Sequence, residues 1–189
     1  IPGRELDLDL TLYAEQLVLQ GEGGYSRKGH RAEEASFYYS RPQAIAHGKV
    51  NGRAMQGGAW LDHEWSNAYM APEAAGWDWA GINLAGGDAL MAFQMRARAG
   101  GVHYAQPGVS FTPLRTWRSP RTGIEYPVSM RLKTPQRELR LEPLMDDQEF
   151  DARASTGIIY WEGAVRAFEG NREAGRGYLE LTGYGEPMK

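Results

Sequence analysis

Apolar and polar residues alternate along most of the chain, with the period of two that is typical of a β-strand with one buried face. The pattern is clearest in residues 6–12, where every second position is leucine, and it returns with larger apolar side chains in residues 126–132. Aromatic, β-branched and alternating segments predict further strands over residues 36–40, 45–50, 54–61, 80–84, 89–95, 109–114, 138–144, 158–167 and 177–182.

Turn residues separate these segments at short intervals. Asn51 and Gly52 predict a hairpin between the strands on either side of them, and the Gly-Gly-Asp of residues 86–88 predicts a second. The helical period is weak, and only residues 12–19 and 72–75 could hold a turn of helix. We therefore expect more than about 40% strand and less than about 15% helix, well away from the average globular protein.

The expected fold class is all-β. Some ten short strands joined by glycine- and proline-rich turns are typical of an antiparallel barrel or sandwich. Many inward positions carry small residues, which leaves room for a cavity. A lipocalin-like antiparallel β-barrel that encloses one hydrophobic ligand is the simplest architecture with these properties.

Composition excludes several function classes. The 189 residues suffice for one well-buried domain, or one domain and part of another. A net charge of −3 with interspersed basic residues gives no sign of a nucleic-acid partner, and no apolar run is long enough to predict a transmembrane segment. The absence of cysteine excludes disulfides and thiolate metal sites but leaves the cellular compartment open.

Residues 57–79 concentrate the candidate chemistry, because four of the six tryptophans lie there. Strand alternation predicts that Trp60, Asp62 and Glu64 share one face, while His63 and Trp65 occupy the other. Buried tryptophan needs a partner for its N–H group, so this cluster is expected to form the wall of a pocket or part of a core.

Asp78 is expected on an apolar face, in register with the alternating apolar positions of residues 80–84, and the two tryptophans of residues 77–79 take the opposite face. A carboxyl group in such a place needs a partner or a function. Burial would raise its pKa. A neighbouring cation such as Arg96 or Arg131 would instead make Asp78 a structural anion.

Six short motifs occur in the same order as in the carotenoid 1,2-hydratase (hydroxyneurosporene synthase) family. That family includes bacterial predicted secreted hydrolases and is related to fungal lipocalin-like pericyclases. The resemblance covers almost the whole chain and rests on SFYYS (36–40), GAWLDHEW (58–65), GWDW (76–79), WRSP (117–120), YWEG (160–163) and GYLELTGY (177–184).

The resemblance implies two lipocalin-like domains in tandem. Residues 1–66 would be the last strands of a first domain, and residues 67–189 the complete second barrel. The family's opening Glu-Trp-Trp-Tyr motif is absent, and residues 98–102 are short, as if a hairpin were missing. We expect residues 6–12 and 37–61 to pair with the second domain or with another copy of the chain, so a missing N-terminal domain or a homo-oligomer partner is implied.

The resemblance also implies a hydro-lyase that adds water to a C=C bond of a hydrophobic isoprenoid or polyene. This chemistry needs a protonated carboxyl group, an electron-rich face beside the cation and a polar group that places water. The catalytic candidates are Asp78 as the acid, Trp65 as the cation wall and His63 as the water-positioning group or base. The ligand-binding candidates are the aromatic residues Tyr38, Trp60, Trp77, Trp79 and Phe93. No cofactor is implied, and a bacterial protein that is periplasmic, secreted or peripheral to a membrane is expected.

Two other interpretations stay open for the acidic stretch. Asp62, His63 and Glu64 could form a buried ion-pair and hydrogen-bond network that locks two domains together. A metal site is not expected, because adjacent residues alternate faces and no second histidine is near His63. Residues 161–163 and 177–183 are expected to serve strand packing and turns.

The alternative function is a non-catalytic lipocalin-like binding protein, or a pericyclase relative, for a small hydrophobic ligand. The fold alone cannot separate this function from catalysis. An enzyme should show Asp78 buried beside His63 and facing a cavity, whereas a carrier should show those groups engaged elsewhere. A serine hydrolase is not supported, since no Gly-x-Ser-x-Gly motif occurs.

Overall fold

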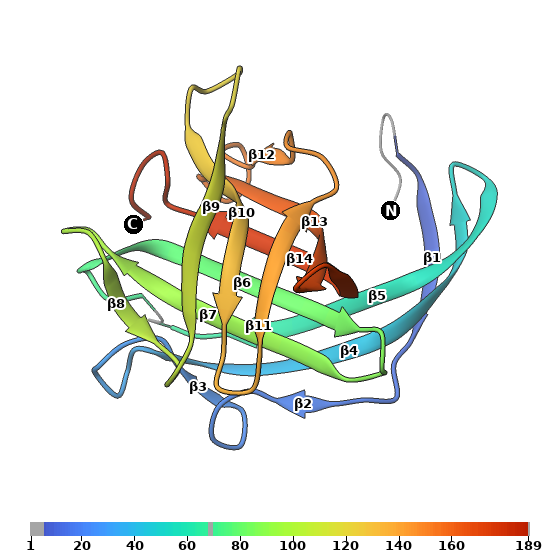
Figure 1. Cartoon of the computed structure of the whole chain (residues 1–189), viewed down its shortest axis with the longest axis horizontal. Helices are drawn as coiled ribbons and strands as arrows, with labels where there is room; N and C mark the ends of the chain where they lie inside the picture. Colours follow the sequence, from blue (N-terminus) through green and yellow to red (C-terminus); the bar gives the residue numbers. More distant parts are fainter. Residues whose placement is uncertain (1–5, 68–69, 189) are drawn as a thin grey trace.

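The structure is a computed structural model that describes residues 6–67 and 70–188. These residues form fourteen strands and no helix, so the all-β class is confirmed (Figure 1). The first sheet contains β1 (Leu8–Tyr13), β2 (Val18–Leu19), β3 (Tyr25–Arg27), β4 (Ala35–Val50) and β5 (Arg53–Trp65). The second contains β6 (Ala74–Leu84), β7 (Ala89–Ala97), β8 (Val102–Ala105), β9 (Ser110–Arg118), β10 (Glu125–Lys133), β11 (Glu138–Pro143), β12 (Glu149–Asp151), β13 (Ile159–Glu169) and β14 (Arg172–Thr182).

The first sheet is built around the long strand β4. One edge of β4 pairs with β1, β2 and β3, and the other edge pairs with β5. Asn51 and Gly52 join β4 to β5 with φ angles of 49° and 74°, the positive values that a two-residue type I′ hairpin requires. The hairpin predicted there is confirmed.

The second sheet is an antiparallel half-barrel in the order β8-β7-β6-β14-β13-β11-β10-β9, with β12 paired to β13 (Figure 1). It curls until β9 approaches β7, where the Phe111 N–H donates to Gln94 Oε1 at 3.3 Å. Within the described residues β8 and β9 remain the two edges of this sheet. The sheet is therefore strongly curled but not closed by a backbone ladder.

The turn between β7 and β8 explains the short segment noted in the sequence. Gly100 and Gly101 adopt φ angles of 94° and 76°, and the Ala97 N–H donates to the Gly101 carbonyl at 2.9 Å. Two consecutive glycines with positive φ thus reverse the chain within a few residues. A longer hairpin is not needed to connect these strands.

The core lies on the concave face of the half-barrel, where alternate residues of the strands meet. Trp161 is its largest fully buried side chain, and its indole N–H donates to the Asp146 carbonyl at 2.7 Å, so its polar atom is satisfied. The alternation predicted for residues 80–84 and 126–132 is confirmed, because the inward members of both rows are buried: Ala80, Ile82, Leu84, Tyr126, Val128, Met130 and Leu132.

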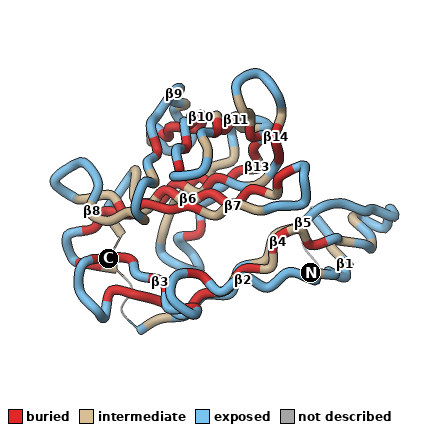
Figure 2. Tube along the Cα trace, turned by 60° about the horizontal axis from the view of Figure 1, so that its bottom comes forward, coloured by how far each residue is buried: buried red, intermediate tan, exposed pale blue. Residues whose placement is uncertain are grey.

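The first sheet packs against the convex face of the second. Figure 2 shows it on one side of β6 and β7, with β10 and β11 on the other. A β-bulge between Arg41 and Ala44 aims Gln43 at β6, where its N–H donates to Asn83 Oδ1 at 2.8 Å. Asn83 Nδ2 in turn donates to the Ala59 carbonyl of β5 at 3.1 Å. Polar side chains therefore connect the two sheets.

The strand expected at residues 6–12 is formed, but it is not half-buried as the sequence predicts. β1 pairs with β4 from Leu8–Val50 to Tyr13–Ile45, but its side chains are mostly exposed. The reason is that the described part of the second sheet covers only the other end of β4 and β5 (Figure 2). The possible helical turn at residues 12–19 is also not formed, because the chain there is extended and ends in β2.

A pair of matched substitutions tests where the core lies. Leu179 of β14 is completely buried, whereas Leu114 of β9 is 41% exposed. Leu179→Ala should lower the free energy of unfolding by about 2–5 kcal/mol, because it removes buried methyl groups and leaves a cavity. Leu114→Ala should cost about 0.5 kcal/mol or less. Urea denaturation measures both, and equal losses would contradict the position of the core.

Candidate functional site

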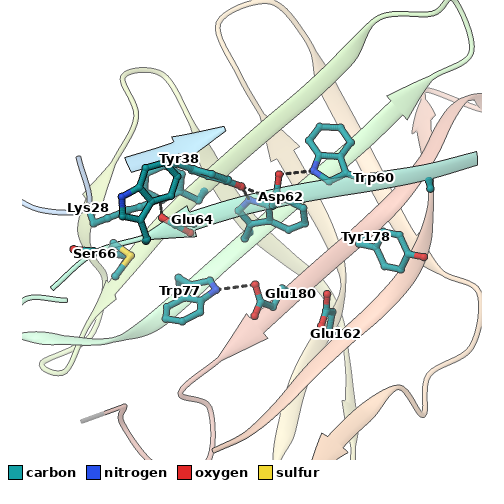
Figure 3. Close-up of a pocket in the computed structure, with 15 residues that line it drawn as sticks. Lys28, Tyr38, Trp60, Asp62, Glu64, Ser66, Trp77, Glu162, Tyr178 and Glu180 are labelled. Atoms are coloured by element: carbon teal, nitrogen blue, oxygen red, sulfur yellow. Dashed lines mark hydrogen bonds and ion pairs between the residues drawn. The ribbon is translucent and has the colours of Figure 1, made fainter. Parts of the chain in front are cut away.

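A pocket of about 680 Å³ lies between the two sheets (Figure 3). Its aromatic lining comes from both sheets and consists of Tyr38, Trp60, Trp65, Trp77, Trp79, Phe93 and Tyr178. Its charged lining consists of Lys28, Asp62, Glu64, Glu162 and Glu180. The volume lies within the range of small-molecule sites in proteins.

Strand alternation explains how these side chains converge. On β5, Trp60, Asp62 and Glu64 point toward the second sheet, as the sequence predicts. On β6, Trp77 and Trp79 point back toward the first sheet. The pocket therefore lies on the outer face of the half-barrel and not in its interior.

A hydrogen-bonded chain crosses the pocket from one sheet to the other. Trp79 Nε1 donates to the Tyr38 hydroxyl at 3.0 Å, and that hydroxyl donates to Asp62 Oδ2 at 2.6 Å. Asp62 Oδ1 accepts from Ser40 Oγ at 2.5 Å and from Trp60 Nε1 at 2.7 Å. Desolvation raises the pKa of Asp62, and these three hydrogen bonds oppose the shift. Asp62 thus belongs to a network that joins the sheets, which is one of the two roles considered for it.

Glu64 is engaged in a second polar contact. Its carboxylate lies 2.8 Å from the ammonium of Lys28 and accepts a hydrogen bond from Ser36. The Lys28 nitrogen also lies 4.1 Å from the ring centre of Phe93 and 4.7 Å from that of Tyr38. Burial lowers the pKa of Lys28, and the charge of Glu64 opposes this. The one lysine among the described residues of the lining is therefore already paired.

Glu162 and Glu180 form a pair of carboxyl groups that face each other. They are direct cross-strand partners in the β13–β14 ladder, and Trp77 Nε1 donates to Glu180 Oε2 at 3.0 Å (Figure 3). Burial raises the pKa of Glu180 to about 7, and the negative charges of Glu162, Glu64 and Asp62 act in the same direction. Burial and the charge of Asp62 also raise the pKa of Glu162. This pair is therefore able to hold a proton near neutral pH.

The five residues expected to bind a ligand all line this one pocket. Tyr38 comes from β4, Trp60 from β5, Trp77 and Trp79 from β6, and Phe93 from β7. The structure thus brings together side chains that are widely separated in the sequence. That they bind a ligand stays a prediction.

Asp78 lies on the other side of β6, on the concave face, and is 1% exposed. Its carboxylate accepts hydrogen bonds from Gln94 Nε2 at 2.8 Å, Arg96 Nε at 3.0 Å and the Tyr184 hydroxyl at 2.8 Å. Burial raises the pKa of Asp78, whereas Arg96 and the hydrogen bonds oppose that shift. Arg96 is the neighbouring cation that the sequence allowed for, and these contacts give the Asp78 carboxyl group a structural role.

His63 and Trp65 lie on the face of β5 that points away from Trp60. His63 Nδ1 is 3.1 Å from the Tyr39 hydroxyl, and its ring centre is 5.0 Å from that of Trp65. Trp65 borders the pocket at its edge, is half exposed and stacks on Phe37 at 5.7 Å. An enzyme of the expected kind would place Asp78 and His63 beside one cavity. The structure does not, because strand alternation puts the two side chains on opposite sides of the packed sheets.

Among the charged and aromatic residues of the pocket lining, four were not among the candidates from the sequence: Lys28, Glu162, Tyr178 and Glu180. Glu162 and Glu180 lie in segments interpreted as strand packing, and they meet only because of the register of β13 and β14. A bulge between Ala167 and Phe168 sets that register, and bulges leave little trace in a single sequence. The available signal is that Glu180 alternates with Leu179 and therefore leaves the core face.

The described residues offer no group of three or more histidine, cysteine or acidic side chains placed to hold a metal ion. They also include no helix with the length and apolar character needed to cross a membrane.

The fold and the pocket define an all-β protein in which a curled antiparallel half-barrel and a second sheet enclose an acidic, tryptophan-lined site. Residues 1–184 match the family model described as AttH-like, and the chain belongs to the AttH-like family. No curated protein matches the chain. The more specific resemblance to carotenoid 1,2-hydratases stays a prediction.

Two solved structures share the fold. An AttH assigned in Nitrosomonas europaea is 47% identical with a TM-score of 0.92, and the match covers 97% of this chain and 64% of that one. Kievitone hydratase from Nectria haematococca is 19% identical with a TM-score of 0.68, and the match covers 98% of this chain and 64% of that one. The chain thus spans 64% of the length of each, and the second likeness shows the fold alone.

Removal of the Asp78 carboxyl group should destabilise the fold. Asp78→Ala leaves the guanidinium of Arg96 without its buried partner, and we expect a loss of about 3–5 kcal/mol in the free energy of unfolding. Asp146→Ala is the matched control, because Asp146 pairs with Arg115 at the surface and should cost about 1 kcal/mol or less. Urea denaturation measures both variants, and a harmless Asp78→Ala would contradict a structural role.

Glu180 should also make stability depend on pH. The folded protein keeps the proton of Glu180 up to a pKa of about 7, whereas a glutamate in the unfolded chain loses its proton near its ordinary pKa of 4.5. Between these two pKa values only the unfolded state loses the proton, so the contribution of Glu180 to stability falls as pH rises. Above the folded-state pKa this contribution is constant. Glu180→Gln should therefore gain stability relative to wild type between about pH 5 and about pH 8.

Urea midpoints at the two pH values measure this effect. Glu173→Gln is the control, because Glu173 lies on the same strand but pairs with Arg166 and Arg176, and its pKa is lowered. If the urea midpoints of wild type and Glu180→Gln change with pH in parallel, Glu180 is ionised over this whole pH range.

Proposed function

We propose that the pocket between the sheets adds water to a C=C bond of a hydrophobic isoprenoid or polyene, with Glu180 as the proton donor. The observation that carries this proposal is the facing pair of Glu162 and Glu180, held beside Trp77 in an aromatic pocket. Of the carboxyl groups in the pocket lining, Glu180 has a pKa of about 7, which suits a general acid. Asp78 lacks access to this pocket, so the role first assigned to it moves to Glu180.

The reaction is balanced with these groups alone. The Glu180 O–H gives its proton to one alkene carbon, and the π electrons form the new C–H bond, which leaves a cation on the adjacent carbon. The oxygen of a water molecule bonds to that carbon. The oxonium ion then loses a proton to the carboxylate pair, which restores the acid. The product is an alcohol, and no oxidant or reductant takes part.

The aromatic lining suits the cationic intermediate. Indole is the most electron-rich of the natural side-chain rings, and Trp60, Trp77 and Trp79 line the space beside the carboxyl pair. Phe93 and Met95 add apolar surface for the hydrocarbon part of a substrate. Hydration is also the class of reaction named for the kievitone hydratase, whose fold this chain shares.

The second candidate function is a non-catalytic binding protein, and a specific observation favours it. Asp78 is engaged by Gln94, Arg96 and Tyr184 and His63 contacts Tyr39, as expected for a carrier in which those two polar groups are engaged elsewhere. The two functions differ in what they require of Glu180. A carrier needs no proton there, whereas a hydratase does.

The proposed acid can be tested with acyclic isoprenoid alkenes in ¹⁸O-labelled water, with mass spectrometry of the products. Glu180→Gln keeps the size of the side chain and removes the acid, so turnover should fall by about a hundredfold or more. Wild-type turnover should also decline as pH rises through about 7, because Glu180 loses its proton.

Glu173→Gln controls for the loss of a negative charge on β14 and should leave turnover unchanged. Full activity of Glu180→Gln would exclude Glu180 as the donor. Retention of the alkenes by the wild type with no incorporation of oxygen would favour the binding protein.

A further inference from the structure

The charges that line the pocket do not balance. Four carboxyl groups, those of Asp62, Glu64, Glu162 and Glu180, share the described lining with the single cation Lys28. Lys28 pairs with Glu64 at 2.8 Å and is almost completely buried. Among the described residues, no ion pair within 4.0 Å includes Glu162 or Glu180. The carboxyl pair therefore faces the pocket without a cation of its own.

The aromatic side chains around this pair form two walls that meet at a steep angle. The rings of Trp60 and Trp79 are 6.1 Å apart with an angle of 81° between their planes. The same pocket already holds a cation against aromatic rings, since the ammonium of Lys28 lies over Phe93 and Tyr38. Aromatic rings with nearby carboxylates are the features by which proteins recognise substituted ammonium ions.

We infer that the pocket binds an organic ammonium ion, with its positive charge between the indole rings and the Glu162–Glu180 pair. The inference rests on the proposed function, because the ammonium nitrogen would take the place of the cationic carbon in hydration. A metal ion fits less well, because Asp62 and Glu64 are engaged and the described residues contain no metal-ligand group. A quaternary ammonium needs no hydrogen-bond donor or acceptor, so an aromatic wall suffices on its other sides.

Binding of a cation should be coupled to the protonation state of Glu180. Glu162, Asp62 and Glu64 face Glu180 with negative charge, and Lys28 faces it with positive charge. Trp77 donates a hydrogen bond to Glu180. Tyr160 on β13 and the pocket residues Tyr38 and Tyr178 are further neighbours with phenol groups. A bound cation favours the carboxylate form of Glu180. Affinity for the ammonium ion should therefore increase as pH rises through the titration of the pair, with release of a proton on binding.

The test compares ligands that have nearly the same shape and differ in charge. Choline and 3,3-dimethylbutan-1-ol form such a pair, and benzyltrimethylammonium is a larger probe. Isothermal titration calorimetry at about pH 8 should show binding of both ammonium ions, with choline about tenfold tighter than its neutral counterpart. Glu162→Gln and Glu180→Gln should each weaken choline binding severalfold, whereas Glu173→Gln should not.

NMR of the tryptophan indole N–H groups places the ligand. Choline should shift the signals of Trp60, Trp77 and Trp79, while Trp161, buried in the half-barrel core, is the internal control. Equal affinity for the two matched ligands, or shifts confined to other tryptophans, would overturn the inference. Folded variants are recognised by an unchanged Trp161 signal, so lost binding cannot be confused with lost structure.

The same experiments separate this inference from the proposed function. Hydration of an isoprenoid by a protein that does not discriminate choline from the alcohol would overturn the ammonium site and leave the hydratase. Tight, charge-dependent binding with no hydration would leave the ammonium site and overturn the hydratase.

Discussion

The hydrogen bonds from Trp79 to Tyr38 and from Tyr38 to Asp62 are the interaction on which the site depends. Each residue comes from a different strand, so the two bonds tie β6, β4 and β5 together. Asn83 adds a second polar bridge to the Ala59 carbonyl. Because hydrogen bonds require defined distances, they hold the sheets at a fixed separation, whereas purely apolar faces would close on each other. The pocket is the space that this separation leaves, and its aromatic lining packs around it.

Strand alternation gives acidic residues on the two faces of one sheet different surroundings. Asp78 on the concave face accepts hydrogen bonds from Gln94, Arg96 and Tyr184, and these contacts oppose the rise in its pKa that burial causes. Glu180 on the convex face accepts a hydrogen bond from Trp77 and has several carboxyl neighbours, which favour the protonated acid. Burial alone therefore does not distinguish a structural carboxyl group from a candidate proton donor. The balance of donors and charges around the group is also needed.

The fold class, the hairpins and the faces of β5 and β6 could be predicted from local sequence, because alternation and turn residues act within a few positions. The aromatic part of the pocket follows from the same rule. Glu162 and Glu180 could not be found in this way, since their meeting depends on the register of β13 and β14 and on a bulge. Lys28 lies in a polar segment before β4, and only the packing of that segment brings its ammonium over Phe93. The sequence placed His63 on the correct face of β5, but it could not show that this face and Asp78 lie on opposite sides of the packed sheets.

The carboxyl pair itself argues for a positive charge in the pocket. Two glutamates directly opposite on paired strands repel when both are ionised, and the partial burial of Glu180 adds a desolvation cost. A carrier of neutral hydrocarbons has no need of these two destabilising carboxyl groups, because aliphatic side chains at these positions would fill the same space. The repulsion is relieved when one carboxyl group holds a proton or when a cation enters between the pair and the indoles. Protonation supplies the acid for an addition to an alkene, and cation binding matches the charge that such an addition creates. Both forms of relief point to the same place, the space beside Glu180 and Trp77.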